Sequence, residues 1–338
     1  MTNQPPNFCS SECAGRVSVT ILSSRRRIAE RFRWAALINV HSRQTNHMKT
    51  NKATSLGILV LILRMNQAFS TDVTINRSGS QVILSWPLAD TNEFYLQTTT
   101  NLSAPIAWLN AADPATNGNS LVVTNQIAGT NSFYRLRAWE VLFDGTNTTA
   151  LRSPTANSFP SNSWVVTNGT IRSKVAANAT NFMTVSTYTN FELRLNWKCD
   201  PYGNSGIFYR RPPGVASDIP EYQLFDDANV ATAGYTDSTY QNPVNLMGAV
   251  YGIIAPTNKT LVPAGQWNDC RVVVQGYHVT HWLNGKVIVD YQINDPVHTN
   301  SMSQATNTYI AFQNKGTGDH GRAPGVVYYR DIKIRRLP

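Results

Sequence analysis

A run of alternating polar and apolar residues in the middle of the chain combines two carboxylates with an amide. It reads Glu-Tyr-Gln-Leu-Phe-Asp over residues 221–226. Because residues two apart on a strand share a face, we expect Glu221, Gln223 and Phe225 to point together, and a bulge or strand end would bring Asp226 to the same rim. This arrangement predicts a sugar site, although solvent-facing residues on an antiparallel sheet give the same pattern.

Arg210 lies on the preceding predicted strand. Its guanidinium can pair with Glu221 or with negative charge that develops on a substrate, and a structural ion pair explains it equally well. Asn204 and Ser205 stand before Gly206, which permits close backbone approach. They either form a turn or bind sugar hydroxyls.

Two further polar residues stand near the C-terminus. Gln313 ends a predicted strand and could donate a hydrogen bond to a substrate oxygen. Lys315 could do the same, or stabilise an enolate.

Two tryptophan and two histidine residues are further candidates for the same site. Trp267 and Trp282 could each stack on a sugar ring, but Trp on such a sheet is more often half-buried core. His278 and His281 follow the alternation of a strand, so we expect both on the surface rather than as ligands.

The elements that would position these residues are short strands. About a dozen strand-like runs over 140–338, with no helical segment between them, predict an all-β, double-sheet jelly roll, which commonly offers one concave face to a ligand. Asn284-Gly285 between two of these runs is the sequence of a type I′ hairpin turn.

Residues 71–138 predict a separate small β-sandwich module. Their short alternating runs are separated by turn-forming stretches such as 87–92 and 113–119. Similar modules are attached to secreted bacterial proteins as spacers or contact surfaces. No cluster of ionisable residues indicates chemistry in this one.

The charge is unevenly distributed along the 338 residues. The formal net charge is +9, of which residues 1–70 carry +8 and residues 71–338 only +1. We therefore expect no basic face on the folded part and no binding to nucleic acid.

The N-terminal region contains the pattern of a secretory signal peptide. Residues 48–52 (Met-Lys-Thr-Asn-Lys) are positive, 56–63 are apolar, and 68–70 (Ala-Phe-Ser) offer small residues at a cleavage site. Residues 48–70 are thus predicted to be a signal peptide, and 1–47 a mispredicted upstream extension or a disordered arm. An apolar run of about eight residues is too short to span a bilayer, which needs about 20. The predicted localisation is secreted or periplasmic.

Cysteine and metal chemistry are sparse. Cys199 and Cys270 are the pair that remains after such a leader, and they could form one disulfide or two buried thiols. No cysteine and histidine spacing fits a zinc site. Glu221, Asp226, Asp227 and Asn204 could supply oxygen ligands to a divalent ion, but an acidic calcium loop is missing, so we expect no cofactor and a metal-free site.

Several ordered motifs resemble the 3-keto-disaccharide hydrolase family. They lie over nearly all of 140–338 and comprise 142–146 (Leu-Phe-Asp-Gly-Thr), 204–210 (Asn-Ser-Gly-Ile-Phe-Tyr-Arg), 221–226, 248–252 (Gly-Ala-Val-Tyr-Gly), 265–268 (Gly-Gln-Trp-Asn), 282–285 (Trp-Leu-Asn-Gly) and 328–334 (Tyr-Tyr-Arg-Asp-Ile-Lys-Ile).

This resemblance implies a concanavalin-like, glucanase-like jelly roll that cleaves glycosides already oxidised to a ketone at sugar C3. Glu221, Asp226 and Arg210 would then be catalytic. Asn204, Ser205, Gln223, Tyr251, Trp267, Gln313 and Lys315 would bind the substrate. Where the family often has Gln-x-His-Gly, this chain has Gln-Asn-Lys-Gly over 313–316. Because the chain has no dinucleotide-binding motif, a separate oxidoreductase would have to make the ketone.

Two other functions fit the same residues. Glucanases of this fold use a Glu-x-Asp-x-x-Glu strand, so residues 221–226 could serve a retaining glycosidase, whose two carboxyl groups lie about 5–5.5 Å apart. The chain could also be a non-catalytic carbohydrate-binding or adhesion module.

Overall fold

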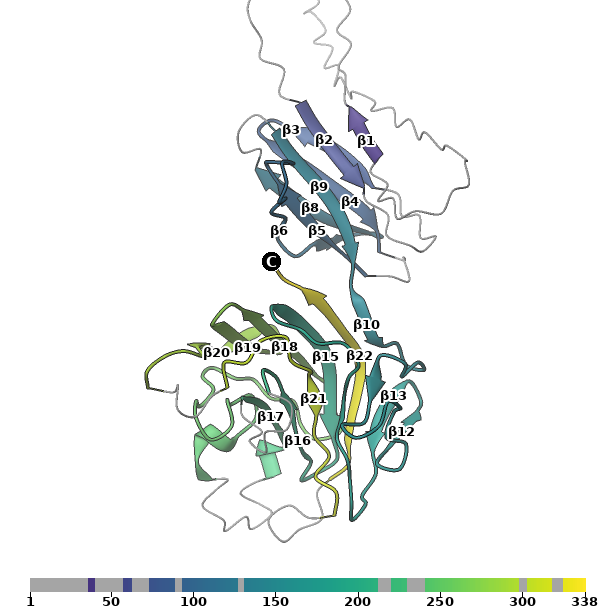
Figure 1. The fold of residues 1–338 in the computed structure, drawn as a ribbon, viewed down its shortest axis with the longest axis vertical. Coiled ribbons are helices and arrows are strands. Elements are labelled where there is room, and N and C mark those ends of the chain that lie inside the picture. Colours follow the sequence, from purple (N-terminus) through teal and green to yellow (C-terminus); the bar gives the residue numbers. More distant parts are fainter. Residues whose placement is uncertain are drawn as a thin grey trace, which may run out of the picture. The chain divides into compact units, whose positions relative to one another are not determined.

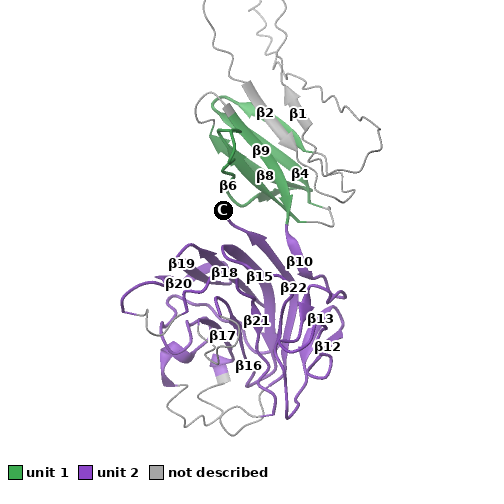
Figure 2. Ribbon diagram, in the orientation of Figure 1, with its two compact units in different colours: residues 1–138 green, residues 139–338 purple. Residues whose placement is uncertain are grey.

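A computed structural model describes the residues 73–88, 93–126, 131–211, 220–229, 241–297, 303–317 and 325–338, together with the backbone of the strands Ala36–Asn39 and Gly57–Ile62. The chain divides into two compact units, Met1–Ala138 and Trp139–Pro338 (Figure 2).

Unit 1 contains two sheets. One has the strand order β3-β4-β8-β7 and the other the order β1-β2-β9-β5-β6 (Figure 1). The strands are β1 (Ala36–Asn39), β2 (Gly57–Ile62), β3 (Thr74–Ser78), β4 (Gln81–Pro87), β5 (Phe94–Thr99), β6 (Leu109–Asn110), β7 (Ala115–Asn117), β8 (Ser120–Gln126) and β9 (Asn131–Ala138).

Alternation builds the core of unit 1. In β4, Val82, Leu84 and Trp86 are buried, and they pack with residues of β5, β8 and β9 in one apolar cluster. The residues between them are more exposed. The two sheets of unit 1 therefore share a single small core.

The predicted signal peptide lies mostly outside the described residues. Of residues 48–70, only Gly57–Ile62 is described, as β2, which pairs in parallel with β9. The leader and the secreted localisation stay predictions.

The larger sheet of unit 2 has eight strands in the order β12-β13-β22-β15-β18-β19-β20, with β10 also paired to β22. Its pairings are antiparallel. The strands are β10 (Glu140–Phe143), β12 (Trp164–Thr167), β13 (Thr170–Ser173), β15 (Phe191–Cys199), β18 (Asn268–Gln275), β19 (His278–Leu283), β20 (Lys286–Gln292) and β22 (Val327–Arg336). At the β19–β20 turn, Asn284 and Gly285 both have positive φ, as the predicted type I′ turn requires.

The smaller sheet of unit 2 has five antiparallel strands in the order β11-β14-β21-β16-β17. These are β11 (Leu151–Arg152), β14 (Phe182–Thr184), β21 (Ala311–Phe312), β16 (Asn204–Phe208) and β17 (Glu221–Phe225). β17 would be an edge strand, but the segment 248–251 runs beside it and hydrogen bonds to its backbone.

The two sheets of unit 2 stack on a common apolar core. Leu193 and Trp197 of β15 belong to the same buried cluster as Ile207 of β16 and Tyr222 and Leu224 of β17. Such a pair of stacked antiparallel sheets confirms the predicted all-β jelly-roll sandwich.

Helical structure is minimal in the described residues. It comprises 3₁₀ turns, among them η1 (Asp227–Asn229) and η3 (Pro243–Asn245). None of the helices in the described ranges is long and apolar enough to cross a membrane.

Candidate active site

The outer face of the five-stranded sheet carries the polar residues that the sequence singled out. Tyr222 and Leu224 of β17 point into the core, so Glu221 and Gln223 point to the opposite, outer face. Register pairs Gln223 with Gly206, and Glu221 with Phe208, on the neighbouring strand β16. The predicted alternation of Glu221 and Gln223 thus holds, and both side chains lie over β16.

Gly206 makes room for the carboxylate of Glu221. A β-carbon built at Gly206 would overlap the Oε1 atom of Glu221, so the carboxylate lies directly over the glycine backbone. Glu221 is only 4% exposed. Any side chain at position 206 would displace the carboxylate, which explains why this strand has a glycine at its centre.

Two amides line the same face. The hydrogen-bonding groups around Gln223 assign its amide nitrogen toward Glu221, where it donates to Oε1 at 3.2 Å and to the Ser205 carbonyl at 3.1 Å. The amide groups of Gln223 and Asn204 are 3.4 Å apart, and both residues are 2% exposed. Glu221, Gln223 and Asn204 therefore form a continuous buried polar row.

Gln313 completes this row from the other side of β16. Its backbone N–H donates to the Gly206 carbonyl at 2.9 Å, which places it beside Gly206 just after β21. Its side-chain Oε1 is buried and has no hydrogen-bond partner among the described residues. An amide so placed has hydrogen-bonding capacity left for a bound molecule.

Ser205 lies on the opposite face from Gln223. Its hydroxyl points into the core, where it lies 2.5 Å from the Tyr329 hydroxyl and donates to the Gln313 carbonyl at 2.6 Å. The predicted role in binding hydroxyls of a substrate is therefore not supported by its position. Ser205 instead fixes the backbone of Gln313.

An apolar patch borders the carboxylate. Met183, Phe208 and Ala311 pack together on the outer face, and register places them in one row that ends at Glu221. Tyr309 packs against this patch, with the Arg152 guanidinium 4.6 Å from its ring centre. The carboxylate is thus bounded by apolar side chains on one side and by amides on the other.

Tyr251 is adjacent to this row through its backbone, and Lys315 is adjacent to it in the sequence. The backbone N–H of Tyr251 donates to the Glu221 carbonyl at 3.1 Å. Lys315 follows Asn314, whose amide binds the Ser163 carbonyl at 2.8 Å and whose Oδ1 accepts from the Gly316 N–H at 2.9 Å. The turn that carries Lys315 is therefore fixed two residues beyond Gln313.

Arg210 is directed elsewhere. It has a positive φ of 55° directly after β16, and its guanidinium donates to the backbone carbonyls of Gly276 and Ala305. It is 2% exposed, and burial lowers its pKa. The structure thus does not bring the Arg210 guanidinium to the Glu221 carboxylate, because the left-handed residue turns the chain out of the strand.

Asp226 lies at the far end of β17. It is five positions beyond Glu221, or about 17 Å along an extended chain at ~3.4 Å per residue. Its Oδ2 accepts a hydrogen bond from the Tyr202 N–H at 2.8 Å. The predicted common rim of Glu221 and Asp226 is therefore not formed.

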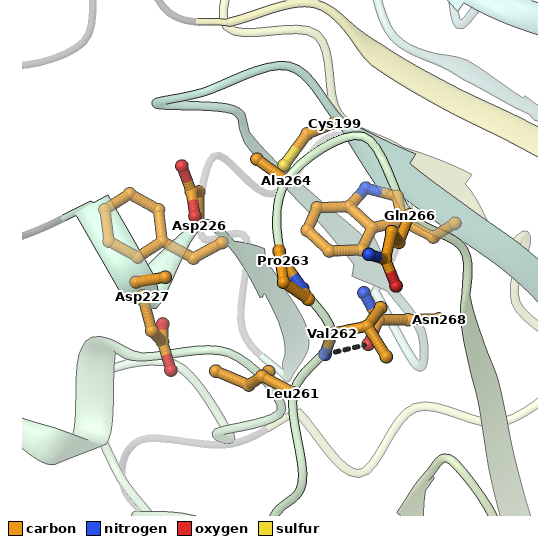
Figure 3. A pocket seen from close by; sticks show the side chains of 12 residues that line it. Cys199, Asp226, Asp227, Leu261, Val262, Pro263, Ala264, Gln266 and Asn268 are labelled. Atoms are coloured by element: carbon orange, nitrogen blue, oxygen red, sulfur yellow. Dashed lines mark hydrogen bonds between the residues drawn. The ribbon is translucent and has the colours of Figure 1, made fainter.

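Asp226 instead lines a small separate pocket (Figure 3). Asp227, Cys199 and the loop 261–264 also line it, and the Val262 N–H donates to Asn268 Oδ1 at 3.5 Å. Burial raises the pKa of Asp227, whose carboxylate pairs with the Lys259 ammonium at 2.5 Å. These contacts hold the loop in place.

Phe225 also departs from the predicted alternation. It packs in the core cluster and lines the pocket with Trp197 and Cys199. It is the last residue of β17, where the chain turns toward η1, so the two-residue period no longer applies.

Comparison with known proteins assigns the larger unit. Residues 138–335 match the 3-keto-alpha-glucoside-1,2-lyase-like domain. The chain belongs to this family. The predicted resemblance to 3-keto-disaccharide hydrolases is thereby confirmed.

Two relatives illustrate the family. A 3-keto-disaccharide hydrolase of Bacteroides thetaiotaomicron is 26% identical over 177 residues, which are 44% of this chain. The chain spans 59% of the length of that curated relative. A crystal structure assigned as a candidate glycosyl hydrolase from Parabacteroides distasonis is 26% identical, covers 59% of this chain and 94% of its own, and has a TM-score of 0.50.

In this member of the lyase-like family, Trp267 lies apart from the polar row that Glu221, Gln223, Asn204 and Gln313 form on the outer face of the five-stranded sheet. It lies just before β18 in the eight-stranded sheet, with the Lys198 ammonium 5.0 Å and the Arg330 guanidinium 4.2 Å from its ring centre. Trp282 is in the same sheet, under the Arg271 guanidinium at 4.6 Å. Both rings therefore belong to the sheet opposite the one that carries Glu221.

Cys199 and Cys270 are two buried free thiols, so the second of the two predicted alternatives is correct and the disulfide is not formed. Cys270 pairs with Leu195, four residues along β15 from Cys199. Four residues span about 13 Å, whereas disulfide-linked Cα atoms lie about 4.4–6.8 Å apart. Burial raises the pKa of both thiols.

His281 is fully buried, contrary to the predicted surface position. It shares the core face of β19 with Val279 and Leu283. Its Nδ1 lies 2.9 Å from the Gly248 carbonyl and its Nε2 2.6 Å from the Tyr209 hydroxyl, which in turn lies 2.8 Å from that of Tyr291. A neutral imidazole that donates from Nδ1 and accepts at Nε2 satisfies all three contacts.

The hydrogen-bonded group of His281, Tyr209 and Tyr291 in the core is connected to the backbone of Gln223 through Gly248. The N–H of Gly248 donates to the Gln223 carbonyl at 2.8 Å, while its carbonyl faces His281. Sequence reasoning did not find this link, because nothing local in the sequence indicates which face of β19 is buried. By contrast, His278 is half exposed and pairs with Asp290 at 2.5 Å.

Within the described ranges, no group of three or more His, Cys, Asp or Glu side chains could hold a metal ion.

Proposed function

We propose that the chain is a secreted enzyme that cleaves 3-keto-glycosides, with Glu221 as the base that removes the C2 proton. The observation that carries this proposal is the Glu221 carboxylate, 4% exposed over Gly206 and in hydrogen-bond distance of the Gln223 amide. Membership of the lyase-like family supports the substrate class.

A ketone at C3 makes this chemistry accessible to a carboxylate. The C3 carbonyl acidifies the C2 proton, which Glu221 takes, and the C–H electron pair becomes the C2–C3 double bond of an enolate. The enolate then collapses to the ketone and expels the C1 substituent, which leaves with a proton. Water adds to the resulting C1–C2 double bond, with its oxygen on C1 and a proton returned to C2. The net reaction is hydrolysis of the glycosidic bond.

Of the side chains in this row, that of Gln313 is best placed to hydrogen-bond to the enolate oxygen. Its backbone N–H binds the Gly206 carbonyl. Its side-chain Oε1 has no partner among the described residues and can accept a hydrogen bond from a substrate hydroxyl. The amide nitrogen could donate to the oxygen at C3 as negative charge develops there. Asn204 and Gln223 would then bind neighbouring hydroxyls. Arg210, predicted for the enolate, has its guanidinium on two backbone carbonyls instead.

The geometry counts against a retaining glycosidase. That mechanism needs two carboxyl groups about 5–5.5 Å apart. Asp226, the second carboxylate of the strand, lies about 17 Å along the chain from Glu221, and its carboxylate binds the Tyr202 backbone. A single base acting on an activated C2–H bond suits the site better.

The test compares two carboxylates of the same strand. Glu221→Gln should lower turnover of a 3-keto-disaccharide by about 10²–10⁴-fold, the usual contribution of a positioned general base. Asp226→Asn removes the same charge at the other end of β17 and should leave turnover within a few-fold of wild type. Sugar release is measured with the 3-keto substrate and with its unoxidised parent, and circular dichroism checks the fold.

Full activity in Glu221→Gln would remove this residue from the mechanism. Loss of turnover in Asp226→Asn but not in Glu221→Gln would identify Asp226 as the base. Cleavage of the unoxidised parent would favour an ordinary glycosidase, and tight binding without turnover of either sugar would favour a binding module.

The proposal includes two conditions outside the active site. Export depends on the predicted leader at 48–70. The 3-keto substrate must come from a separate oxidoreductase that acts on sugar C3, because the sequence has no dinucleotide-binding motif of its own.

A further inference from the structure

The outer face of the eight-stranded sheet concentrates positive charge. Core residues such as Leu193, Val272 and Tyr329 alternate with outward positions on β15, β18 and β22. The outward positions of these strands and of β13 hold seven bases: Arg172, Arg194, Lys198, Arg271, Arg330, Lys333 and Arg335. The carboxylates on the same strands are Glu192, Asp269 and the 64% exposed Asp331. The near-neutral total of residues 71–338 therefore conceals a basic face, contrary to the expectation from the sequence.

One half of this face is neutralised internally. Glu192 is 1% exposed and accepts hydrogen bonds from Arg194 at 2.6 Å and from Arg335 at 2.8 Å. It also forms an ion pair with Arg271 at 2.8 Å. Asp269 adds a second carboxylate near Arg194 and Lys333. These groups satisfy one another and have a structural role.

The other half is a row in which cations and aromatic rings alternate. Register aligns Arg172 of β13 with Tyr328 of β22, and Tyr328 with Lys198 of β15. Trp267, which directly precedes Asn268 of β18, follows Lys198 in this row. Arg330 lies on β22, two residues from Tyr328, and its guanidinium reaches the Trp267 ring from beside the row. We call these five residues the cationic ladder.

Ring contacts connect the ladder. Lys198 Nζ lies 4.9 Å from the Tyr328 ring centre and 5.0 Å from that of Trp267. The Arg172 guanidinium lies 5.9 Å from the Tyr328 ring and the Arg330 guanidinium 4.2 Å from the Trp267 ring. These contacts hold the three cations and the two rings together in one cluster at the surface.

The ladder has more charge than its own contacts neutralise. Within the described ranges, Arg172 and Lys198 are matched with aromatic rings and form no ion pair. A cation–π contact at an exposed site contributes only about 0.5–1 kcal/mol. Arg330 has one carboxylate nearby, the 64% exposed Asp331, whose Oδ2 lies 3.3 Å from Arg330 Nε. This Nε is buried, so an anion could reach only the rest of the guanidinium, on a side chain that is 40% exposed. Arg172 and Lys198, which form no ion pair among the described residues, are therefore the main sites for an anion.

We propose that the cationic ladder binds an acidic polysaccharide. Its guanidinium and ammonium groups would bind carboxylate or sulfate groups, and Tyr328 and Trp267 would contact the intervening sugar rings. Arg172 and Lys198 are two strands apart, which is about 10 Å at ~4.8 Å per strand. That separation suits a polymer with one anionic group per disaccharide.

A polynucleotide fits this row less well. Its strand carries a charge about every 3.4 Å, so it would meet only three cations and would also approach Asp200 and Asp331. Asp200 accepts from the Tyr328 hydroxyl at 3.3 Å, so this carboxylate lies beside the ladder. The neighbouring carboxylates penalise dense negative charge more than sparse charge.

The ladder and Glu221 are on opposite faces of the sandwich. The ladder occupies the outer face of the eight-stranded sheet, and Glu221 the outer face of the five-stranded sheet. A polymer on the ladder would leave the Glu221 face open. This inference does not depend on the reaction proposed above.

The test measures binding of the full chain by isothermal titration calorimetry. The probes are hyaluronan and unsulfated chondroitin, which each carry one carboxylate per disaccharide, with neutral laminarin and duplex DNA as comparisons. The double variant Arg172→Gln/Lys198→Gln should bind both acidic polysaccharides at least tenfold more weakly than wild type, with a weaker dependence on salt. Lys286→Gln is the matched control, since Lys286 is an exposed base at the edge strand β20 of the same sheet, and its affinity should stay within twofold of wild type. All variants retain the basic residues of 1–70, so the differences report the ladder.

Thermal unfolding and 3-keto-disaccharide turnover are measured on the same samples. Both should be close to wild type, because the substituted side chains are at the surface and far from Glu221. If the double variant does not fold, Lys198→Gln alone should still weaken binding, and the charge-preserving Lys198→Arg should not. Equal affinity for laminarin and the acidic polysaccharides, unchanged affinity in a folded variant, or tighter binding of duplex DNA would overturn the proposal.

Discussion

Lowering the pH from 7.5 to 5 should destabilise unit 2 through one buried side chain, His281. Complete burial lowers the pKa of this imidazole from 6.5 to about 4, and the hydrogen bond to the Gly248 carbonyl only partly opposes the effect. The folded protein therefore holds His281 neutral at a pH where an unfolded chain would protonate it.

The sign and size of this change in stability follow from the pKa values of His281 in the unfolded and folded states. Below pH 6.5 the unfolded state binds a proton that the folded state does not, so stability falls as the pH falls, and the loss is complete near pH 4. The gap of about 2.5 between the two values corresponds to about 3 kcal/mol in full. At pH 5 the loss from this residue is about 2 kcal/mol.

Urea unfolding of wild type and His281→Gln at pH 7.5, 6 and 5 isolates this contribution. At pH 7.5 the variant should be less stable by about 1–3 kcal/mol, because the Tyr209 hydroxyl loses its partner. Between pH 7.5 and 5, however, wild type should lose about 2 kcal/mol more than the variant. His278→Gln removes a half-exposed histidine from the same strand and should retain the wild-type pH dependence. Parallel pH curves for wild type and His281→Gln would refute the reasoning.

Three further predictions concern the packing around the site. Gly206→Ala places a methyl group onto the Glu221 carboxylate and should lower turnover as strongly as Glu221→Gln. It should also reduce the free energy of unfolding by about 1–3 kcal/mol. Wild-type kinetics of this variant would contradict the position of the carboxylate. Asp227→Asn breaks the pair with Lys259 and should reduce the free energy of unfolding by about 1–3 kcal/mol with turnover nearly unchanged, as denaturation and kinetics would show. In a chain with Cys9 and Cys13 replaced by serine, Cys199 and Cys270 should not react with a thiol reagent while the protein is folded. Both should react after the protein is unfolded without a reductant. If neither reacts in the unfolded chain, the two cysteines form a disulfide after all.

The sequence predicts the elements of this fold better than their mutual placement. Alternation correctly assigns Glu221 and Gln223 to one face, since the rule depends only on neighbours within a strand. It fails at Phe225 and Asp226, where the strand ends, and at Arg210, where a positive φ turns the chain. Such local departures have no signal in residue type.

Placement between sheets is a separate difficulty. Trp267 lies in the sheet opposite Glu221, and His281 faces the core. Both facts depend on which sheet each strand joins, which periodicity alone does not specify. The cationic ladder illustrates the same limit, because a near-neutral total charge carries no information about its distribution over two faces.

The segment 248–251 has a consequence for self-association. Without it, the strand that carries Glu221 would present a row of unpaired backbone groups, the kind of edge at which chains add to one another as strands. The Ala249 carbonyl accepts from Gln223, and the N–H groups of Gly248 and Tyr251 donate to the Gln223 and Glu221 carbonyls. The segment thus occupies the backbone positions that a second chain would need, and the His281 contact to Gly248 secures it from inside. The same four residues that pair with the backbone of β17 therefore protect this edge of the sheet from adding a strand of another chain.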